Sequence, residues 1–339
     1  MINIMNSKLL YILSLIILLL ISIHGNAFAD GGAFKYVDNS ILERFKEDSQ
    51  LCFINYQNET QKMIINITLN DKFEEEKAIW LFPIPAKPNE TKIDIIDSEP
   101  ILSGVSSEHI LANRFNDCFT QLYLTQIYTY PYFMFQLVSN MTGDDQGRSK
   151  ESDKFRVIDK INKFGITSEL ISVKNKKDFI EYLTKHKIKF PDDFNKIIDG
   201  YLGKDYIFVV SWLSNLAEYK NKTNGRYPIA VYVTFKTPEI FFPLKFTSIY
   251  GNLKIPISLY VINFITPKIF DNIRQYTKIE HFRIPYSTPN DLLNFFFDIK
   301  KFDRLEYTKI SINSEAINLT EDLWIDHKES FRISMIKFF

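Results

Sequence analysis

Short runs of β-branched and aromatic residues, each ended by turn residues or prolines, constrain the fold of this chain more than any other feature. A run of about four to eight such residues is too short for a helix of ordinary length and is typical of a strand. The composition agrees, because the 339 residues include 30 Phe and 18 Tyr but only 11 Gly, and aromatic residues are enriched in strands. The runs lie at residues 51–56, 63–69, 78–82, 92–97, 206–212, 229–235, 241–247, 255–264 and 307–312.

Helical periodicity is restricted to a few segments. It predicts helices at residues 178–183 and 191–201, a short helix begun by the capping box at residues 40–43, and another at residues 288–297. One more helix is predicted within residues 106–127, and its apolar face consists of Leu111, Phe115, Cys118 and Leu122. Because strands and helices do not alternate strictly, we predict an α+β fold that is rich in strands, mostly antiparallel, with several short helices.

The first 29 residues are typical of a secretory signal peptide. A nearly unbroken apolar run at residues 9–23 precedes Ala27-Phe28-Ala29, a small-x-small cleavage site. The alternative is an uncleaved anchor helix, but the run is shorter than the roughly 20 apolar residues that a membrane span needs. We therefore expect cleavage after Ala29, export to a secreted or envelope-associated location, and no spanning segment in the mature chain.

A polar stretch that contains glycine divides the mature chain. Residues 144–153 form a predicted linker or long loop. It separates an N-terminal α+β region at residues 30–143 from a C-terminal α+β region at residues 154–339. The length agrees with one large domain or two modest ones.

Charge and motif content exclude several classes of function. The 41 Lys and Arg balance 41 Asp and Glu, whereas a nucleic-acid-binding protein needs an excess of positive charge. The sequence contains no phosphate-binding glycine loop, no Gly-x-Ser-x-Gly nucleophile motif and no Cys-x-x-Cys pair. We therefore expect neither nucleic acid nor a cofactor as a partner.

Several segments of the chain follow the order found in one known family. They are Asp30-Gly31-Gly32, the proline-rich segment from Trp80 to Pro88, residues 179–201, residues 206–210, residues 235–244, and Leu319-Thr-Glu-Asp322-Leu-Trp324. In these segments the chain resembles the domain-of-unknown-function family 2330, a family of exported bacterial and archaeal proteins. The resemblance implies an exported α+β protein, and it brings no established activity, catalytic residue or cofactor.

Three carboxylates follow the proline-rich segment closely. Asp94, Asp97 and Glu99 could supply the pair of carboxyl groups that a glycan hydrolase uses as general acid and base. The alternative is a polar strand edge and turn. A metal site is not expected, because the nearest approach to a ligand pair, His327 with Glu329, falls short of the three or four ligands that such a site needs.

The oxidation state of the two cysteines and the glycosylation of six sequons depend on the compartment in which the chain resides. Export permits a disulfide between Cys52 and Cys118, and two buried thiols are the alternative. The sequons begin at Asn58, Asn66, Asn89, Asn140, Asn221 and Asn318. Because Asn66 lies in a predicted strand, we expect its side chain to be inaccessible.

The most unusual stretch lies between Asp117 and Asp144, which contains many aromatic residues and no charged residue. Tyr128, Tyr130 and Tyr132 alternate, so an extended chain places all three on one side. We predict that they form an accessible aromatic strip for a binding partner. The alternatives are a buried core segment and a surface at a membrane interface.

Trp80 introduces the proline-rich segment. We predict that it is a wedge in the core, and the alternative is a rigid ledge for a ligand, built with the prolines at positions 83, 85 and 88.

The sequence contains no catalytic constellation. It favours an exported cell-envelope or secreted protein with a non-catalytic binding or structural role, whose partner is an envelope glycan or protein. The alternative is an extracytoplasmic, carboxylate-dependent hydrolase that acts on glycans. Paired carboxylates in a deep pocket would favour the hydrolase, and carboxylates that point singly to solvent would favour the binding protein.

Overall fold

The computed structural model describes residues 28–29, 32–37, 41–44, 50–68, 78–102, 104–106, 156–173, 175–185, 192–223, 228–285, 292, 294–296 and 304–327. The first 27 residues, the strip of Tyr128, Tyr130 and Tyr132, the helix face from Leu111 to Leu122 and the predicted linker at residues 144–153 lie outside these residues. Cys118 and Glu329 lie outside them as well.

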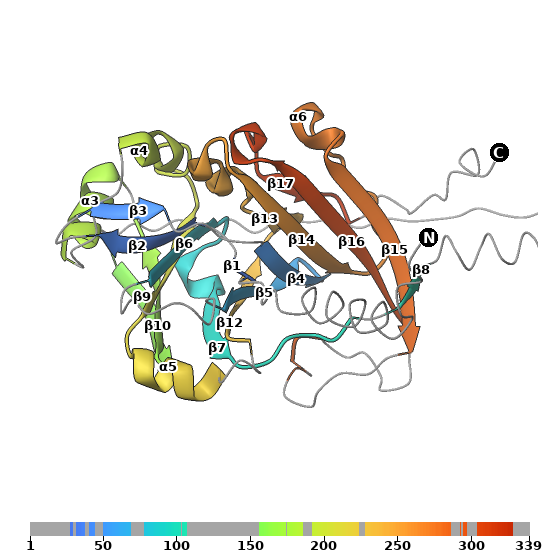
Figure 1. Cartoon of the computed structure of the whole chain (residues 1–339), viewed down its shortest axis with the longest axis horizontal. Helices are drawn as coiled ribbons and strands as arrows, with labels where there is room; N and C mark the ends of the chain where they lie inside the picture. Colours follow the sequence, from blue (N-terminus) through green and yellow to red (C-terminus); the bar gives the residue numbers. More distant parts are fainter. Residues whose placement is uncertain are drawn as a thin grey trace, which may run out of the picture.

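A large sheet contains nine strands among the described residues (Figure 1). Neighbouring strands in it are antiparallel, except that β4 runs parallel to β14. Its order is β7 (Lys92–Ile96), β12 (Ala230–Lys236), β5 (Thr60–Thr68), β4 (Gln50–Gln57), β14 (Lys254–Ile262), β16 (Arg304–Glu315), β15 (Thr277–Pro285) and β8 (Val105–Ser106), and β1 (Phe28–Ala29) pairs with β5.

Two further sheets complete the described strands. The second sheet has the order β3 (Ile41–Arg44), β2 (Gly32–Val37), β6 (Ala78–Ile84), β11 (Ile207–Leu213), β10 (Ile166–Ser172) and β9 (Arg156–Lys163), and the smallest pairs β13 (Ile240–Phe242) with β17 (Leu323–Ile325). The helices are α3 (Lys176–Lys185), α4 (Asp192–Ile198), α5 (Leu216–Thr223) and α6 (Asp271–Arg274), and the 3-10 helices are η2 (Pro88–Glu90), η3 (Leu244–Tyr250) and η5 (Ala316–Asn318). The described chain is therefore strand-rich and mostly antiparallel, with few and short helices, which is broadly compatible with the predicted α+β class. Strands from before residue 143 and after residue 154 are neighbours in both larger sheets.

The main core contains side chains from the large sheet, the second sheet and α3 and α4. In the large sheet it takes alternate residues, such as Cys52 and Ile54 of β4 and Val231 and Val233 of β12, all completely buried. Successive side chains of a strand point to opposite faces, so the residues between these lie on the other face. We call this other face the outer face; a second, smaller apolar cluster lies there, built on Phe53, Ile64, Ala230, Ile262 and Tyr307.

Trp80 lies in β6 and is completely buried within the main core, as predicted for a wedge. Pro83 continues the same strand opposite Phe208 of β11. The described pairing of β2 with β6 covers only residues 78–81, so Pro83 occupies a position with one described neighbour strand. A proline without a backbone N–H is compatible with such a position.

Two local predictions are wrong. The capping box at residues 40–43 does not begin a helix, because Ile41–Arg44 pairs with β2 as strand β3. The strand predicted at 241–247 ends at Phe242, and Leu244–Tyr250 forms the 3-10 helix η3 after Pro243. Proline cannot donate to a strand ladder, which explains the early end.

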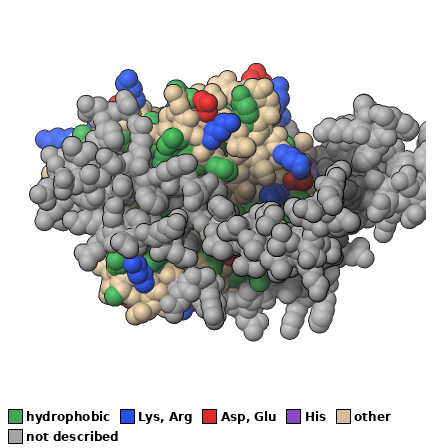
Figure 2. Space-filling model, viewed as in Figure 1, with side chains coloured by type: hydrophobic (Ala, Val, Ile, Leu, Met, Phe, Trp, Pro, Cys, Tyr) green, Lys and Arg blue, Asp and Glu red, His purple; other side chains and the backbone are tan. Residues whose placement is uncertain are grey.

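The described surface is mixed in character. Figure 2 shows hydrophobic side chains interspersed with Lys, Arg, Asp and Glu on the described part of one face. Within the described ranges, no helix is long and apolar enough to cross a membrane.

Candidate functional site

The three carboxylates that could form a hydrolytic pair each contact a different partner. Asp94 of β7 forms an ion pair with Lys163 at the end of β9, and Asp97 forms one with Lys222 of α5. Glu99 accepts a hydrogen bond of 3.0 Å from the Asn66 side chain of β5, and burial raises its pKa. These contacts join β7 and the segment after it to β9, α5 and β5. The three carboxylates therefore have a structural role, because each of them connects two elements of the fold.

His281, His327 and Cys52 are also engaged in packing. His281 is buried, and its Nε2 lies 3.0 Å from the backbone oxygen of Ile265. The His327 ring lies 4.8 Å from that of Tyr56. Cys52 is buried in the main core. No group of three metal-ligating side chains occurs in the described part of the chain.

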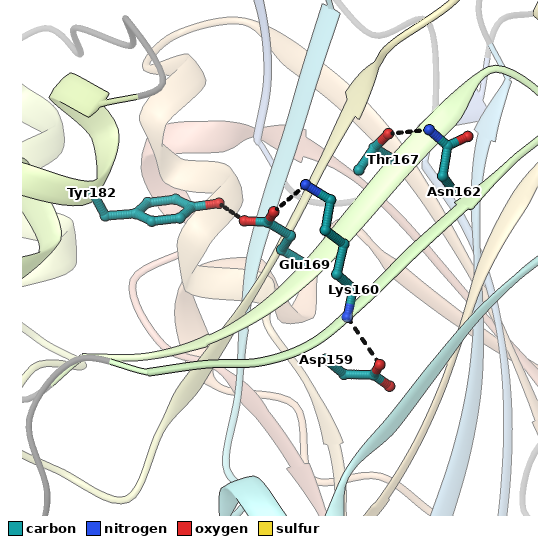
Figure 3. Close-up of polar contacts among 6 residues, drawn as sticks. All are labelled: Asp159, Lys160, Asn162, Thr167, Glu169 and Tyr182. Atoms are coloured by element: carbon teal, nitrogen blue, oxygen red, sulfur yellow. Dashed lines mark hydrogen bonds and ion pairs between the residues drawn. The ribbon is translucent and has the colours of Figure 1, made fainter.

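A buried carboxylate links the second sheet to α3 (Figure 3). Glu169 of β10 is 5% exposed, and Tyr182 of α3 donates to its Oε2 at 2.8 Å while Lys160 of β9 approaches its Oε1 at 2.9 Å. Figure 3 shows Tyr182 and Lys160 reaching Glu169 from opposite sides. Lys160 also lies 5.5 Å from the Trp212 ring centroid. Burial, followed by the charge of Glu169, raises the pKa of Tyr182. The Glu169 carboxylate thus joins α3 to β10 and β9 through one hydrogen bond and one ion pair.

A second carboxyl group lies beside an exposed tryptophan. We name this set the Trp324 cluster; it consists of Trp324, Phe241, Tyr206, Tyr201 and Asp322. Trp324 of β17 is 36% exposed, and its ring centroid lies 4.7 Å from that of the fully buried Phe241 in β13. The β13–β17 register pairs these two residues directly. The ring centroid of Tyr206 lies 6.1 Å from that of Phe241 and 5.1 Å from that of Tyr201. The aromatic rings of the cluster therefore extend from the surface into the core.

Asp322 is the polar member of the Trp324 cluster. Its Oδ1 accepts a bond of 2.9 Å from the Tyr201 hydroxyl and one of 3.0 Å from the Lys245 backbone N–H. Burial raises the pKa of Asp322 from 3.8 to about 6, although these hydrogen bonds and the charges of Lys245 and Lys204 act in the opposite direction. The pKa of Tyr206 rises to about 12, first through burial and then through the charge of Asp322. The Asp322 carboxyl group therefore changes its protonation state near pH 6.

Sequence reasoning did not single out the Trp324 cluster, although its members lie in segments that carry the family resemblance. Tyr201, Tyr206, Phe241 and the Asp322–Trp324 stretch come from four separate segments, which β17 and η3 bring together. The available signal was the alternation of Asp322 and Trp324, because positions i and i+2 of an extended chain share one side. That signal does not reveal Phe241, whose place depends on the pairing of distant strands.

The chain matches no family model and no curated protein. Solved structures of baculovirus P35 are similar to it at a distance. The crystal structure of baculovirus P35 is 11% identical with a TM-score of 0.31, and the match covers 82% of this chain and 95% of that chain. The caspase-8/P35 complex is 9% identical with a TM-score of 0.32, covering 82% of this chain and 96% of that chain. We draw no inference from similarities of this size.

Proposed function

We propose that this chain is an exported, non-catalytic binding protein of the cell envelope and that the Trp324 cluster contacts a glycan. The observation that carries the proposal is the partly exposed indole of Trp324, which rests on buried Phe241 beside Asp322. A rigid aromatic face offers apolar area for stacking on a sugar ring at little entropic cost. Ligand sites combine such apolar surface with a few fixed polar groups that set orientation.

The polar groups of the cluster suit sugar hydroxyls. Asp322 is fixed by Tyr201 and by the Lys245 backbone, so its orientation is set before a ligand arrives. Lys204, which lies outside the cluster but whose charge acts on Asp322, is also anchored, because its ammonium donates to the Gly200 carbonyl at 2.7 Å. Preorganised groups lose less conformational entropy on binding, which favours affinity.

The separate engagement of Asp94, Asp97 and Glu99 supports a binding role over the alternative, a glycan hydrolase. Each of the three has a different partner from a different element. A retaining or inverting glycosidase instead holds two carboxyl groups facing one bond, about 5–10 Å apart.

Oligosaccharide binding tests the proposal. The mature chain would be titrated with chitotetraose, cellotetraose and mannotetraose, with tryptophan fluorescence and calorimetry as readouts. We expect at least one of the three to bind, and Trp324→Ala to weaken binding at least tenfold. Tyr276→Ala is the matched control, because Tyr276 is a 42% exposed aromatic residue on a different segment.

Two outcomes would contradict the proposal. Binding by none of the three sugars, or equal loss in the Trp324 and Tyr276 variants, would remove the role of the Trp324 cluster. Shortened sugars after prolonged incubation would favour the hydrolase. Export is tested separately by mass spectrometry of the protein recovered from its host, where a mature chain that still begins at Met1 would contradict it.

A further inference from the structure

The connection between β15 and β16 is far longer than the hairpin requires. The two strands are antiparallel, and their register extends to the pair Pro285 and Arg304. Strand ends that meet in this way can be joined by a turn of about two residues. Here residues 286–303 make the connection, and connections longer than about 12–15 residues are uncommon and are usually either functional loops or linkers.

Part of this connection packs on the outer face of the large sheet, in an apolar cluster that also includes Ile284 of β15 and Leu305 of β16. Leu292, Phe295 and Phe296 are 3%, 1% and 2% exposed. They belong to the cluster that contains Phe53 of β4, Ile64 of β5 and Ala230 of β12. In the sheet order, β14 and β16 separate β15 from β4, and β5 and β12 lie beyond. The described residues of the connection therefore also contact strands that β14 and β16 separate from β15.

The outer face holds the backbone of this segment as well as its side chains. The Asn55 amide of β4 donates to the Phe295 carbonyl at 2.8 Å, and Asn55 is 3% exposed. The Asn294 carbonyl accepts from the Tyr232 hydroxyl of β12 at 3.3 Å and from the Lys62 ammonium of β5. Three strands thus supply donors to two consecutive carbonyls. Bonds to the main chain give affinity for a peptide, whereas sites for its side chains give specificity.

A second segment on the outer face is held by the same chemistry. The chain crosses from β7 to β8, at opposite edges of the large sheet (Figure 1). On the way, Tyr307 of β16 donates its hydroxyl hydrogen to the Leu102 carbonyl at 3.1 Å. Between the two held segments, Phe53, Tyr260, Tyr307 and Phe282 form a row of ring contacts over β4, β14, β16 and β15, with centroid distances of 5.2, 5.9 and 5.1 Å.

We infer that the outer face is a binding site for a peptide segment with two consecutive aromatic residues, and that residues 292–296 occupy this site in the free chain. The chemistry of the partner follows from that of the occupant: two adjacent phenyl rings enter the apolar cluster, and two adjacent carbonyls meet Asn55, Tyr232 and Lys62. A tethered occupant has an effective concentration in the ~mM range, so it keeps weaker competitors out. A partner peptide binds by displacing it.

Rescue of an emptied site tests this inference. In the full-length mature chain, Phe295→Ala with Phe296→Ala removes both rings while the connection stays in place. A synthetic peptide with the sequence of residues 290–298 is then added in trans, and thermal unfolding and fluorescence anisotropy are recorded. We expect the peptide to raise the melting temperature of the double variant in a dose-dependent way. We also expect it to bind that variant at least about tenfold more tightly than the wild-type chain, whose tethered segment competes.

Matched controls separate a binding site from general stabilisation. A peptide with Ser in place of the residues that correspond to Phe295 and Phe296 should leave the melting temperature unchanged. Adding Asn55→Ala to the double variant should weaken peptide binding at least tenfold, whereas Asn313→Ala, at an exposed asparagine of β16, should not. A chain in which a two-residue Asn-Gly turn replaces residues 286–303 should bind the peptide as the double variant does.

Three outcomes would overturn the inference. The first is a double variant that the peptide neither stabilises nor refolds. The second is equal rescue by the serine peptide. The third is a wild-type dimer in light scattering that dissociates when the peptide is added, because the natural occupant would then be the same segment of a second copy.

Discussion

Replacing Asp322 by Asn should make the protein more stable at neutral and alkaline pH. Asn keeps an oxygen that can accept the bonds from Tyr201 and from the Lys245 backbone, and it cannot ionise. Burial raises the pKa of Asp322 from 3.8 to about 6. At ~1.4 kcal/mol for each pH unit, this difference corresponds to about 3 kcal/mol. Because the side chain is partly exposed, water screens part of it, and we expect about 2 kcal/mol.

The pH dependence gives the sign of the effect. Between pH 3.8 and 6 the folded chain binds more protons at Asp322 than the unfolded chain does, so this group's contribution to stability falls as the pH rises. The contribution is fully present below pH 3.8 and is lost above about pH 6. The free energy of unfolding of Asp322→Asn should therefore equal that of wild type near pH 3.5 and exceed it by about 2 kcal/mol at pH 8.

Urea unfolding at several pH values between 3.5 and 8 measures this difference directly. Glu321→Gln is the control, because Glu321 is the exposed neighbouring carboxylate. A difference between Asp322→Asn and wild type that does not change with pH would refute the reasoning, as would a variant less stable than wild type at pH 8.

Three further predictions concern stability and modification. Tyr182→Phe should lower the free energy of unfolding by about 1–3 kcal/mol, because a donor to the buried Glu169 carboxylate is lost. Lys160→Ala removes a side chain that is 57% exposed and should cost less than about 1 kcal/mol. The reverse order of the two losses in urea unfolding would contradict this. Trp80→Ala should cost on the order of 3–5 kcal/mol because the indole is completely buried, and an unchanged melting temperature would remove its role as a wedge. Asn66 should carry no glycan in folded protein secreted from a glycosylating host, because its side chain is 2% exposed and donates to Glu99. Mass spectrometry measures this, and a folded chain with a glycan on Asn66 would refute the buried position of this side chain.

The sequence predicted elements well where an apolar run is uninterrupted. The expected strands at 206–212, 229–235 and 255–264 correspond to β11, β12 and β14, and the helices at 178–183 and 191–201 correspond to α3 and α4. These segments bury enough apolar surface for local pattern and tertiary environment to agree.

Strand β15 shows why other elements could not be found in this way. Lys278, Glu280 and Arg283 interrupt its apolar pattern, and they belong in a strand because the Lys278–Glu280 and Arg283–Glu306 ion pairs accommodate them. The capping box at residues 40–43 failed for a related reason, since pairing with β2 outweighs a local helix signal. The Trp324 cluster depends on the register of β13 with β17, which no local spacing encodes.

The order of strands in the large sheet also affects when the chain can fold. Its central parallel pair joins β4 to β14, placing Cys52 opposite Leu259, and β5 pairs with β12. Contacts between such distant residues form slowly, because a long loop must close before they contribute. Hairpins such as β4 with β5 can form early, but β4 cannot pair with β14, and its outer face cannot receive Leu292, Phe295 and Phe296, until those residues have been synthesised. For the exported chain proposed above, this connectivity delays completion of the large sheet until most of the polypeptide has been made.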